Sequence, residues 1–416
     1  MSKSLVGIHA EGKIYTDKLL DTSAAAARAI SLYGKENVTN GSSGVMCDEN
    51  STLICLPTVE TTFRNIGIRE LVGYAPIAGM QDYQDAAIRH TFADYQPEGY
   101  IKAIATPGGA GAVSSVIWNY SDPGDAVLTH DWLWAPYKSM CSETGRKLQT
   151  FSLFNENKGF NIASFEAEVR EILKQQDRIV IILNTPGNNP TGYTLTNEEW
   201  DAVIEVVKEN AKADNKSITL LLDIAYIDFT NDPLKSRAFM KKFKNLPDNI
   251  FITLAFSMSK SFTVYGQRTG AIIGLSSSKE VIEEFTHVTQ MTARTRWSNV
   301  NRGCMQIMST ICNDPLMVES LQKERDDSMG MISKRADIFM NEASKFELDV
   351  LPYCGGFFIT IPTVKPDIAC EYLQKNNIFL VPLAKGIRIA ICSIPTIQVK
   401  GLAGQVVEAL KNTSEK

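Results

Sequence analysis

Short apolar runs of strand length recur through the middle of the chain. Longer stretches with helix-like patterns, such as residues 164–174 and 197–211, separate most of them. The second stretch opens with Thr196 three residues before Glu199, the pattern of an N-terminal capping box. Continuous apolar runs are typical of strands buried on both faces, so their alternation with helices predicts a mostly parallel α/β sheet. The expected strands lie at 101–105, 125–130, 148–153, 178–183, 217–223, 250–255 and 270–275.

The C-terminal part of the chain has a different pattern. Residues 314–346 form a long, charge-rich helical stretch, and short strand-like runs follow at 356–362 and 387–392. The length of 416 residues favours two domains. We therefore expect the α/β class: a large domain with a mostly parallel seven-stranded sheet flanked by helices, plus a smaller α+β domain with which the first 45 or so residues pack. The predicted boundaries are 50–325 for the large domain, and 1–49 with 326–416 for the small one.

Composition narrows the class of partner. The chain is 44% hydrophobic, and its net charge of −5 comes without any run of five like charges, which argues against nucleic acid or a membrane surface. The N-terminus lacks the apolar stretch of a signal peptide, and the run 178–183 is too short to span a membrane, so we expect a cytoplasmic protein. The eight cysteines form no Cys-x-x-Cys pair, which favours free thiols and no metal site. A small molecule or another protein is the expected partner.

Lys260 directly follows the expected strand 250–255. Lysine usually lies on a solvated face, and by itself Lys260 would be interpreted in that way. Nearby hydroxyl groups, a glycine and Arg268 favour a functional interpretation. Burial and a neighbouring cation lower the pKa of a lysine amine, which makes it nucleophilic enough to form an imine at neutral pH.

The surroundings of this lysine resemble a known motif. Ser257-x-Ser259-Lys260, followed by Gly266-x-Arg268-x-Gly270, is similar to the cofactor-lysine motif of class I and II aminotransferases, which are fold-type-I pyridoxal-phosphate enzymes. The resemblance continues in the same order from about residue 40 to residue 392. It implies pyridoxal 5'-phosphate as cofactor, covalent attachment to Lys260, and a homodimer whose active sites are shared across the interface.

Two further motifs supply the implied contacts with the cofactor ring. Asp223-Ile224-Ala225-Tyr226 resembles the family's Asp-x-Ala-Tyr, and Asn189-Pro190-Thr191-Gly192 matches its Asn-Pro-Thr-Gly. The resemblance implies that Asp223 pairs with the pyridine nitrogen, while Tyr226 and Asn189 donate to the phenolic oxygen of the ring. Without the resemblance, the aspartate would be interpreted as a helix cap and the Asn-Pro run as a turn. The implied catalytic residues are Lys260, Asp223 and Tyr226.

A glycine-rich run at 106–112 follows the strand 101–105 and opens a helix. Small residues and the helix dipole favour a bound phosphate there. The run resembles the family's phosphate cradle, which Ser257 and Arg268 would complete. Trp134 resembles the aromatic residue that stacks on the ring and borders the substrate, although a core tryptophan is the alternative. Tyr74 matches a tyrosine that reaches the phosphate from the partner subunit. The implied cradle residues are Gly109, Ala110 and Gly111.

Substrate contacts are implied by the same resemblance. Arg388, flanked by apolar residues, is similar to the arginine that binds the substrate α-carboxylate through two hydrogen bonds. Gly44, Asn189 and Trp134 are the other expected contacts. Arg294 aligns with an arginine that, in aspartate-type members, crosses the dimer interface to bind the side-chain carboxylate of the substrate. Arg296 is the alternative if the register differs by two, and a surface arginine is the other interpretation. Phe358 belongs either to the pocket or to the core.

The chain also departs from the aspartate-type pattern. Tyr137 and Asn184 stand where those enzymes place histidines behind the ring-pairing aspartate, and Asn188 replaces another histidine. These departures leave the choice of substrate and the rate open. The chain's own histidines fall outside the matched motifs, so we assign them no catalytic role and regard Lys260 as the proton carrier. They are His9, His90, His130 and His287.

The predicted function is an aminotransferase. It would move an amino group between an L-amino acid (aspartate, glutamate or an aromatic one) and a 2-oxo acid by a ping-pong reaction. Two alternatives stay open: other chemistry of the same cofactor, such as a C–S β-lyase, and a non-catalytic effector-binding homologue. The last would carry an additional DNA-binding segment, for which the chain has no room before residue 40. The sequence does not identify the donor or acceptor, nor whether the role in amino acid metabolism is biosynthetic.

Overall fold

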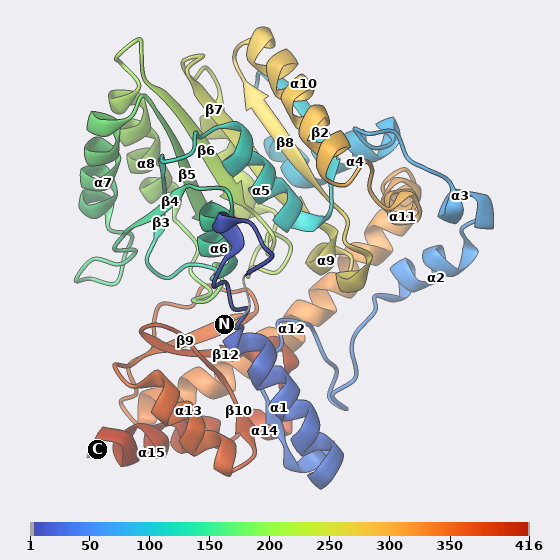
Figure 1. Ribbon diagram of the computed structural model, residues 1–416. Helices are drawn as coiled ribbons and strands as arrows, with labels where there is room; N and C mark the ends of the chain where they lie inside the picture. Colours follow the sequence, from blue (N-terminus) through green and yellow to red (C-terminus); the bar gives the residue numbers. More distant parts are fainter. Residues whose placement is uncertain (1–3, 415–416) are drawn as a thin grey trace.

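A seven-stranded sheet forms the centre of the molecule in the computed structural model, which describes residues 4–414 (Figure 1). The strand order is β2-β8-β7-β6-β5-β3-β4, and only β8 runs antiparallel to its neighbours. The prediction of a mostly parallel seven-stranded sheet is confirmed. Its strands are β2 (Tyr100–Thr106), β3 (Ala126–His130), β4 (Lys147–Phe151), β5 (Arg178–Asn184), β6 (Ser217–Asp223), β7 (Ile250–Ser257) and β8 (Gly270–Ser276).

Helices cover both faces of this sheet. Successive residues of each strand point to opposite faces, so every strand contributes side chains to the cores on both sides. In β5, Ile181 joins the core beneath one layer of helices and Ile182 the core beneath the other. This double burial explains why the strands are continuously apolar. One layer contains α5 (Gly108–Asn119), α6 (Pro136–Glu143) and α10 (Lys279–Arg296). The other contains α2 (Pro57–Asn65), α4 (Gln81–Phe92), α7 (Ile162–Gln175), α8 (Asn197–Asn210) and α11 (Arg302–Cys312).

A second hydrophobic core lies below the sheet layer in Figure 1, around two small sheets. One is antiparallel, with the order β11-β12-β9, and in the other β1 pairs with β10 in parallel. Its strands are β1 (Thr39–Asn40), β9 (Phe358–Pro362), β10 (Ile378–Phe379), β11 (Val381–Pro382) and β12 (Gly386–Ala390). The neighbouring helices are α1 (Lys18–Tyr33), α13 (Pro366–Lys375), α14 (Thr396–Val399) and α15 (Leu402–Ser414).

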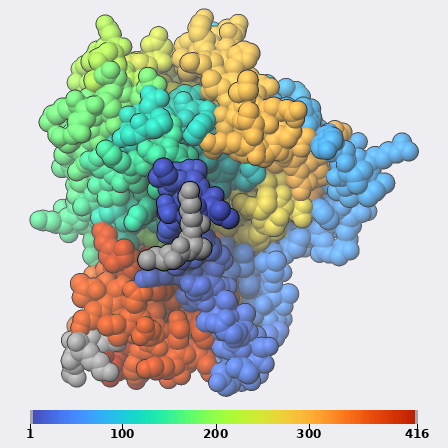
Figure 2. Space-filling view, in the orientation of Figure 1, coloured from blue at the N-terminus to red at the C-terminus, as the bar shows by residue number. Residues whose placement is uncertain are grey.

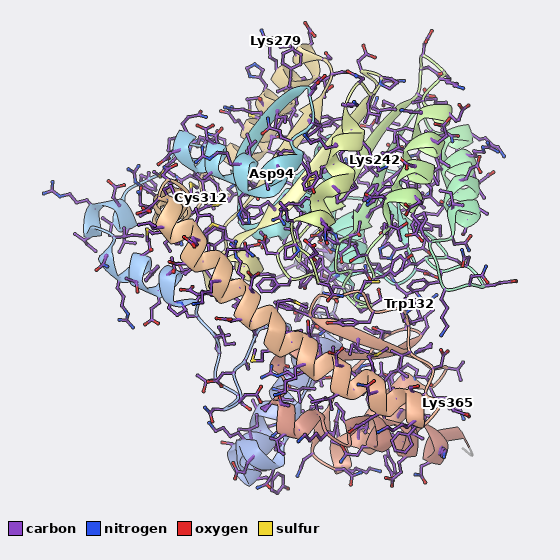
Figure 3. The ribbon with its side chains drawn as sticks, turned by 180° about the vertical axis from the view of Figure 1, so that it is seen from behind. Asp94, Trp132, Lys242, Lys279, Cys312 and Lys365 are labelled. Atoms are coloured by element: carbon purple, nitrogen blue, oxygen red, sulfur yellow. The ribbon has the colours of Figure 1, made fainter. Side chains whose placement is uncertain are left out.

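The helix α12 (Pro315–Lys345) joins the two parts. Figure 3 shows it from behind as one uninterrupted diagonal that starts beside Cys312 and ends near the lower sheets. Leu321, in the N-terminal part of α12, belongs to the upper core, and Phe339, in its C-terminal part, belongs to the lower one. A single rigid element therefore contacts both cores.

The N-terminal segment is divided between the two parts. Residues of α1 and β1 pack with the C-terminal sheets. Lys13 instead forms an ion pair with Glu143 of α6, at 2.8 Å, and Figure 2 shows this dark-blue segment lying across the front of the molecule. Residues 1–3 and 415–416, which the predicted domain boundaries include, lie outside the described part of the chain. None of the helices formed by the described residues is both long and apolar enough to cross a bilayer.

Candidate active site

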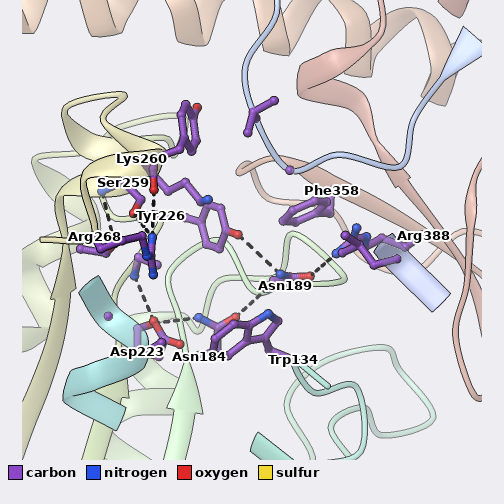
Figure 4. Close-up of a pocket in the computed structure, with 18 residues that line it drawn as sticks. Trp134, Asn184, Asn189, Asp223, Tyr226, Ser259, Lys260, Arg268, Phe358 and Arg388 are labelled. Atoms are coloured by element: carbon purple, nitrogen blue, oxygen red, sulfur yellow. Dashed lines mark hydrogen bonds between the residues drawn. The ribbon is translucent and has the colours of Figure 1, made fainter. Parts of the chain in front are cut away.

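A cavity of about 340 Å³ lies outside the carboxyl ends of the parallel strands, between the sheet and the lower core (Figure 4). Open α/β sheets bind ligands at this edge. The cavity gathers residues from distant parts of the chain that the sequence had singled out. They are Gly44, Gly109, Ala110, Trp134, Asn189, Asp223, Tyr226, Ser257, Lys260, Arg268 and Arg388.

Lys260 reaches into this cavity from a short helix, α9 (Met258–Ser261), that follows β7 directly. Ser257 caps that helix by accepting a hydrogen bond from the backbone N–H of Ser259. The amine lies 4.8 Å from the ring centre of Tyr265 and 6.0 Å from that of Tyr226. Burial, reinforced by nearby arginines, lowers the pKa of Lys260 to about 8. About a tenth of this amine is therefore neutral and nucleophilic at pH 7, far more than at the ordinary lysine pKa.

Asp223 ends β6 and lies on the floor of the cavity. Its Oδ2 accepts a 2.6 Å hydrogen bond from the buried hydroxyl of Tyr137, and its Oδ1 accepts one from the backbone of Ala225. Burial raises the pKa of the Asp223 carboxyl, and the bond from Tyr137 opposes that rise. Tyr137, which departs from the aspartate-type histidine, thus still supplies a donor to this carboxylate. Trp134 packs edge-on against the same tyrosine, with ring centres 5.4 Å apart.

A chain of hydrogen bonds runs across the cavity from Tyr226 to Arg388. The amide of Asn189 lies 3.5 Å from the hydroxyl of Tyr226, and its Oδ1 accepts a 3.2 Å bond from Arg388. Arg388 also donates to the backbone oxygen of Ser42 and stacks on Phe358, with its Cζ 4.4 Å from the ring centre. Phe358 is thus both core and pocket wall. Among the described residues, the Nε of Arg388 has no hydrogen-bond partner although it is buried. That donor is free for an anion.

The opposite end of the cavity is shaped to hold a phosphate. Helix α5 begins at Gly108, where φ is +71° and an added Cβ would lie 2.8 Å from Nη2 of Arg268. At Gly109 an added Cβ would lie 3.3 Å from Ser257. The glycines thus leave room between the helix N-terminus, a hydroxyl and a guanidinium, which are the groups that bind phosphate. Gly111, predicted for the cradle, faces Pro107 instead and does not line the cavity.

The asparagines that replace family histidines form a connected layer behind the cavity. Asn184 donates to the backbone oxygen of Asp223 at 2.8 Å and accepts from the backbone N–H of Asn189 at 2.7 Å. Asn188 bridges Asn184 and the Nε2 of His130. Burial lowers the pKa of His130 to about 4, so this ring is neutral. His130 therefore acts as a packing and hydrogen-bonding group, and none of the four histidines lines the cavity.

Three predicted residues lie away from the cavity of this subunit. Tyr74 is 89% exposed. Arg294 is exposed at the end of α10 and donates to Ser298. Arg296 lies over the ring of Trp118, with its Cζ 4.3 Å from the ring centre. Gly111, Tyr74 and both arginines thus remain outside the group that the fold brings together.

Several lining residues were given no role from the sequence. Leu19 comes from α1, and Val45 follows the predicted Gly44. Ser259 accepts a hydrogen bond from Arg268, and the Tyr265 hydroxyl accepts one from the backbone of Met46. The serine and the tyrosine lie within the lysine motif, which was a usable signal. Nothing local marks Leu19, because it reaches the cavity only through packing of the two cores.

The cavity thus offers a nucleophilic amine, a carboxylate, a phosphate cradle and a buried guanidinium whose Nε has no partner among the described residues. This set fits pyridoxal phosphate and an amino acid, so the fold and the site define a pyridoxal-phosphate-dependent transferase of fold type I. The chain belongs to the aminotransferase class I and II family, whose model matches residues 36–406. It is a transaminase that uses pyridoxal phosphate, as the sequence predicted.

Individual relatives agree with this assignment. A crystal structure of an aminotransferase from Anaerococcus prevotii is 41% identical and superposes with a TM-score of 0.96, covering 98% of this chain and 100% of that one. A cytoplasmic aspartate aminotransferase from Dictyostelium discoideum is 23% identical over 382 residues, covering 89% of this chain and 83% of the relative. An aromatic-amino-acid aminotransferase from Burkholderia pseudomallei, covalently bound to pyridoxal phosphate, shares the fold with a TM-score of 0.78 at 20% identity, covering 97% and 100%.

Proposed function

We propose that Lys260 binds the cofactor and carries the proton in a transamination between a dicarboxylic or aromatic L-amino acid and a 2-oxo acid. The observation that carries the proposal is the buried Lys260, with its lowered pKa, in one cavity with Asp223 and Arg388. When bound, the cofactor supplies the electron sink for the carbanion that deprotonation of the amino acid creates. Asp223 would keep that sink effective by pairing with the ring nitrogen. Tyr226 and Asn189 would donate to the ring oxygen.

Arg388 orients the amino acid. Arg388 lines the cavity and its Nε has no partner among the described residues, so the guanidinium can bind the α-carboxylate with a charge-assisted hydrogen bond. Binding in this way would direct the Cα–H of the substrate toward the amine of Lys260, which would accept the proton. Gly44 lies at the same wall, where a Cβ would meet the ring of Phe358 at 2.8 Å. A side chain at that position would therefore displace the ring beneath Arg388.

Apolar side chains in the lining of the cavity, which include Leu19, Val45 and Trp134, would contact the side chain of the substrate. Such a lining suits an aromatic ring. A second carboxylate needs a cation, and Arg294 is the candidate because a single exposed hydrogen bond to Ser298 holds it. Arg296 is less available since it is stacked on Trp118. The relatives named as aspartate and aromatic-amino-acid aminotransferases support both substrate types.

We also propose that the enzyme is a cytoplasmic homodimer. The exposure of Tyr74 and Arg294 supports the dimer, since both would acquire a role only in a partner's active site. The free thiols of the described chain and the cytoplasmic relative from Dictyostelium support the compartment. The amino donor that is turned over will decide between a biosynthetic and a degradative role.

The test is the absorption spectrum of the cofactor-loaded protein in the near-ultraviolet and visible range. Aspartate, glutamate, tyrosine or phenylalanine, added singly, should shift the band to that of the amine form of the cofactor, which identifies the donor. Lys260→Ala should abolish the original band, while Lys138→Ala, an exposed lysine on α6, should retain it. A band that persists in Lys260→Ala contradicts the role of Lys260. A band that no donor shifts, with pyruvate released from substrates bearing a leaving group, would favour β-elimination.

A further inference from the structure

A buried cluster of charged side chains lies directly beneath the turn that carries Lys260. Asp228, Arg237 and Arg325 are each at most 4% exposed. Asp228 pairs with Arg237 at 2.5 Å and with His90 at 2.8 Å, and the Nη2 of Arg325 lies 4.0 Å from the same carboxylate. Charges buried in this way are costly unless their neighbours compensate for them. The proposed chemistry of the cavity uses none of these four residues.

The charges of the cluster do not cancel. Although burial opposes ionisation, His90 and the two arginines hold the pKa of Asp228 well below its usual value. Burial lowers the pKa of His90, which disfavours a positive charge on the ring. One carboxylate thus faces two guanidinium groups. Arg237 alone makes close contact with Asp228, so the carboxylate does not require Arg325.

Arg325 differs from Arg237 because it also contacts the turn that carries Lys260. Its Nε donates a 2.7 Å hydrogen bond to the backbone oxygen of Ser261, the residue next to Lys260. Its Cζ lies 4.9 Å from the ring centre of Phe262. Helix α9 is only four residues long, so the carbonyl groups at its end depend on partners outside the helix. Arg325 supplies one of those partners from α12.

The other side of the cluster belongs to the segment that carries the ring-binding residues. Asp228 follows Asp223 and Tyr226 in the loop after β6. Arg325 therefore lies between the lysine turn and the loop whose residues would bind the cofactor ring. Figure 4 shows the side chain of Lys260 extending from that turn toward Tyr226.

We propose that Arg325 is a positioning residue for Lys260: its bond to the backbone oxygen of Ser261 anchors the lysine turn to α12, and so fixes the lysine amine relative to Asp223 and Tyr226. The proposal rests on the proposed role of Lys260. Proton transfer requires the amine close to both the substrate carbon and the cofactor, and a displacement of about 1 Å can cost about 100-fold in rate. Binding of the amino acid by Arg388 does not involve this contact. The expected signature is a loss in kcat without a rise in KM.

Arg237 provides the matched control. It pairs with the same carboxylate and is equally buried, but its other bonds go to the backbone oxygens of His90, Thr91, Ile227 and Pro233, none of which belongs to the lysine turn. Arg325→Met should lower kcat by about 10- to 100-fold with KM for the donor within about twofold. The visible circular dichroism per bound cofactor, which reports the orientation of the ring and the lysine, should change as well. Arg237→Met should lower the melting temperature and leave kcat and the dichroism near those of the unaltered protein.

Arg325→Lys is the second variant, in case Arg325→Met does not fold. It keeps the buried positive charge but lacks the planar fork that contacts Ser261 and faces Asp228 together. It should retain most of the stability and still show the loss in kcat. Equal losses in Arg325→Met and Arg237→Met, or unchanged kcat and dichroism in Arg325→Lys, would overturn the proposal. Failure of the Lys260 role itself would appear separately, as a visible band that survives Lys260→Ala.

Discussion

At the scale of single residues, Lys260 shows how burial prepares a side chain for chemistry. Its pKa of about 8 lies well below the ordinary 10.5, because desolvation penalises the ammonium form and Arg268 and Arg388 add to that penalty. Asp223 and Cys392 oppose the shift. The amine is protonated and unreactive below this pKa, and neutral and nucleophilic above it.

This shift predicts how the cofactor-free protein takes up pyridoxal phosphate. The initial rate at which the visible band grows should rise with pH and reach half its maximum near pH 8, the folded-state pKa of Lys260. Stopped-flow absorbance from neutral to alkaline pH measures this profile. A midpoint at the ordinary lysine value would show that the amine is solvated in the folded protein.

Tyr137 provides a second prediction at the same scale. Tyr137→Phe removes the hydroxyl that donates to Asp223, so the pKa of that buried carboxyl should rise further and its pairing with the cofactor ring should weaken. A hydrogen bond to a charged group contributes about 1.5–3 kcal/mol, so we expect kcat to fall by about 10-fold or more. Cofactor affinity, measured by fluorescence titration, should fall with it.

The control for that variant is Tyr193→Phe. Tyr193 also donates a 2.6 Å hydrogen bond to a carboxylate, that of Glu199, but it lies outside the cavity. If both substitutions reduce kcat equally, the effect of Tyr137 is general destabilisation.

Residues within contiguous motifs could be predicted, and isolated ones could not. Asp223, Asn189 and Lys260 each follow a strand within a recognisable run, so their convergence on one cavity was expected. Arg325 carries no such signal, because its partner Ser261 is far away in the sequence and a long charged helix looks solvated. Gly111 was predicted for the cradle but does not line the cavity, because a glycine-rich run does not reveal which of its members borders the pocket.

At the scale of elements, the strands were the easiest features to predict. Burial on both faces makes each of them continuously apolar, and the expected 217–223 coincides with β6. The expected 148–153 lies slightly later than β4 (Lys147–Phe151), because the apolar pattern continues to the buried Leu153 beyond the last paired residue. We propose that the chain divides into domains at 49/50 and 325/326, with α12 continuous across the second boundary.

Helix α12 also fixes the lower core, through Arg335. This side chain is fully buried and donates to the backbone oxygens of Cys47 and Cys392, besides its ion pair with Glu49. Arg335→Met would leave both carbonyl groups without that donor, and we expect the free energy of unfolding to fall by about 2–4 kcal/mol. Urea denaturation of the cofactor-free protein measures the loss. Lys334→Met, an exposed neighbour on the same helix, should change it by less than about 0.5 kcal/mol.

At the scale of the whole molecule, the proposed dimer decides the choice of substrate. Arg294 cannot serve the cavity of its own subunit, which it does not line, so a dicarboxylic substrate would depend on the partner. Arg294→Leu should lower kcat/KM for aspartate and glutamate by about 100-fold, the loss of a charged hydrogen-bonding pair, while aromatic donors change little. Steady-state kinetics with each donor measures the ratio.

Arg296→Leu is the companion variant. Because Arg296 is stacked on Trp118, we expect it to affect stability more than substrate choice. If Arg296→Leu shows the selective loss and Arg294→Leu does not, then Arg296, two residues later, is the arginine that binds the second carboxylate. Equal losses for acidic and aromatic donors in Arg294→Leu would give that residue a structural role.

The antiparallel strand β8 has a consequence for how the enzyme is made. Gly270 at its start pairs with Thr106 at the end of β2, and an added Cβ at Gly270 would lie only 2.8 Å from Gly108. The proposed phosphate cradle is therefore completed only after residue 270 has left the ribosome and β8 has inserted between β2 and β7. Until then, the two strands that carry the proposed cradle are not held together. Afterwards, a bound cofactor stabilises only the finished sheet, so the folded fraction of the protein should rise with the concentration of the cofactor.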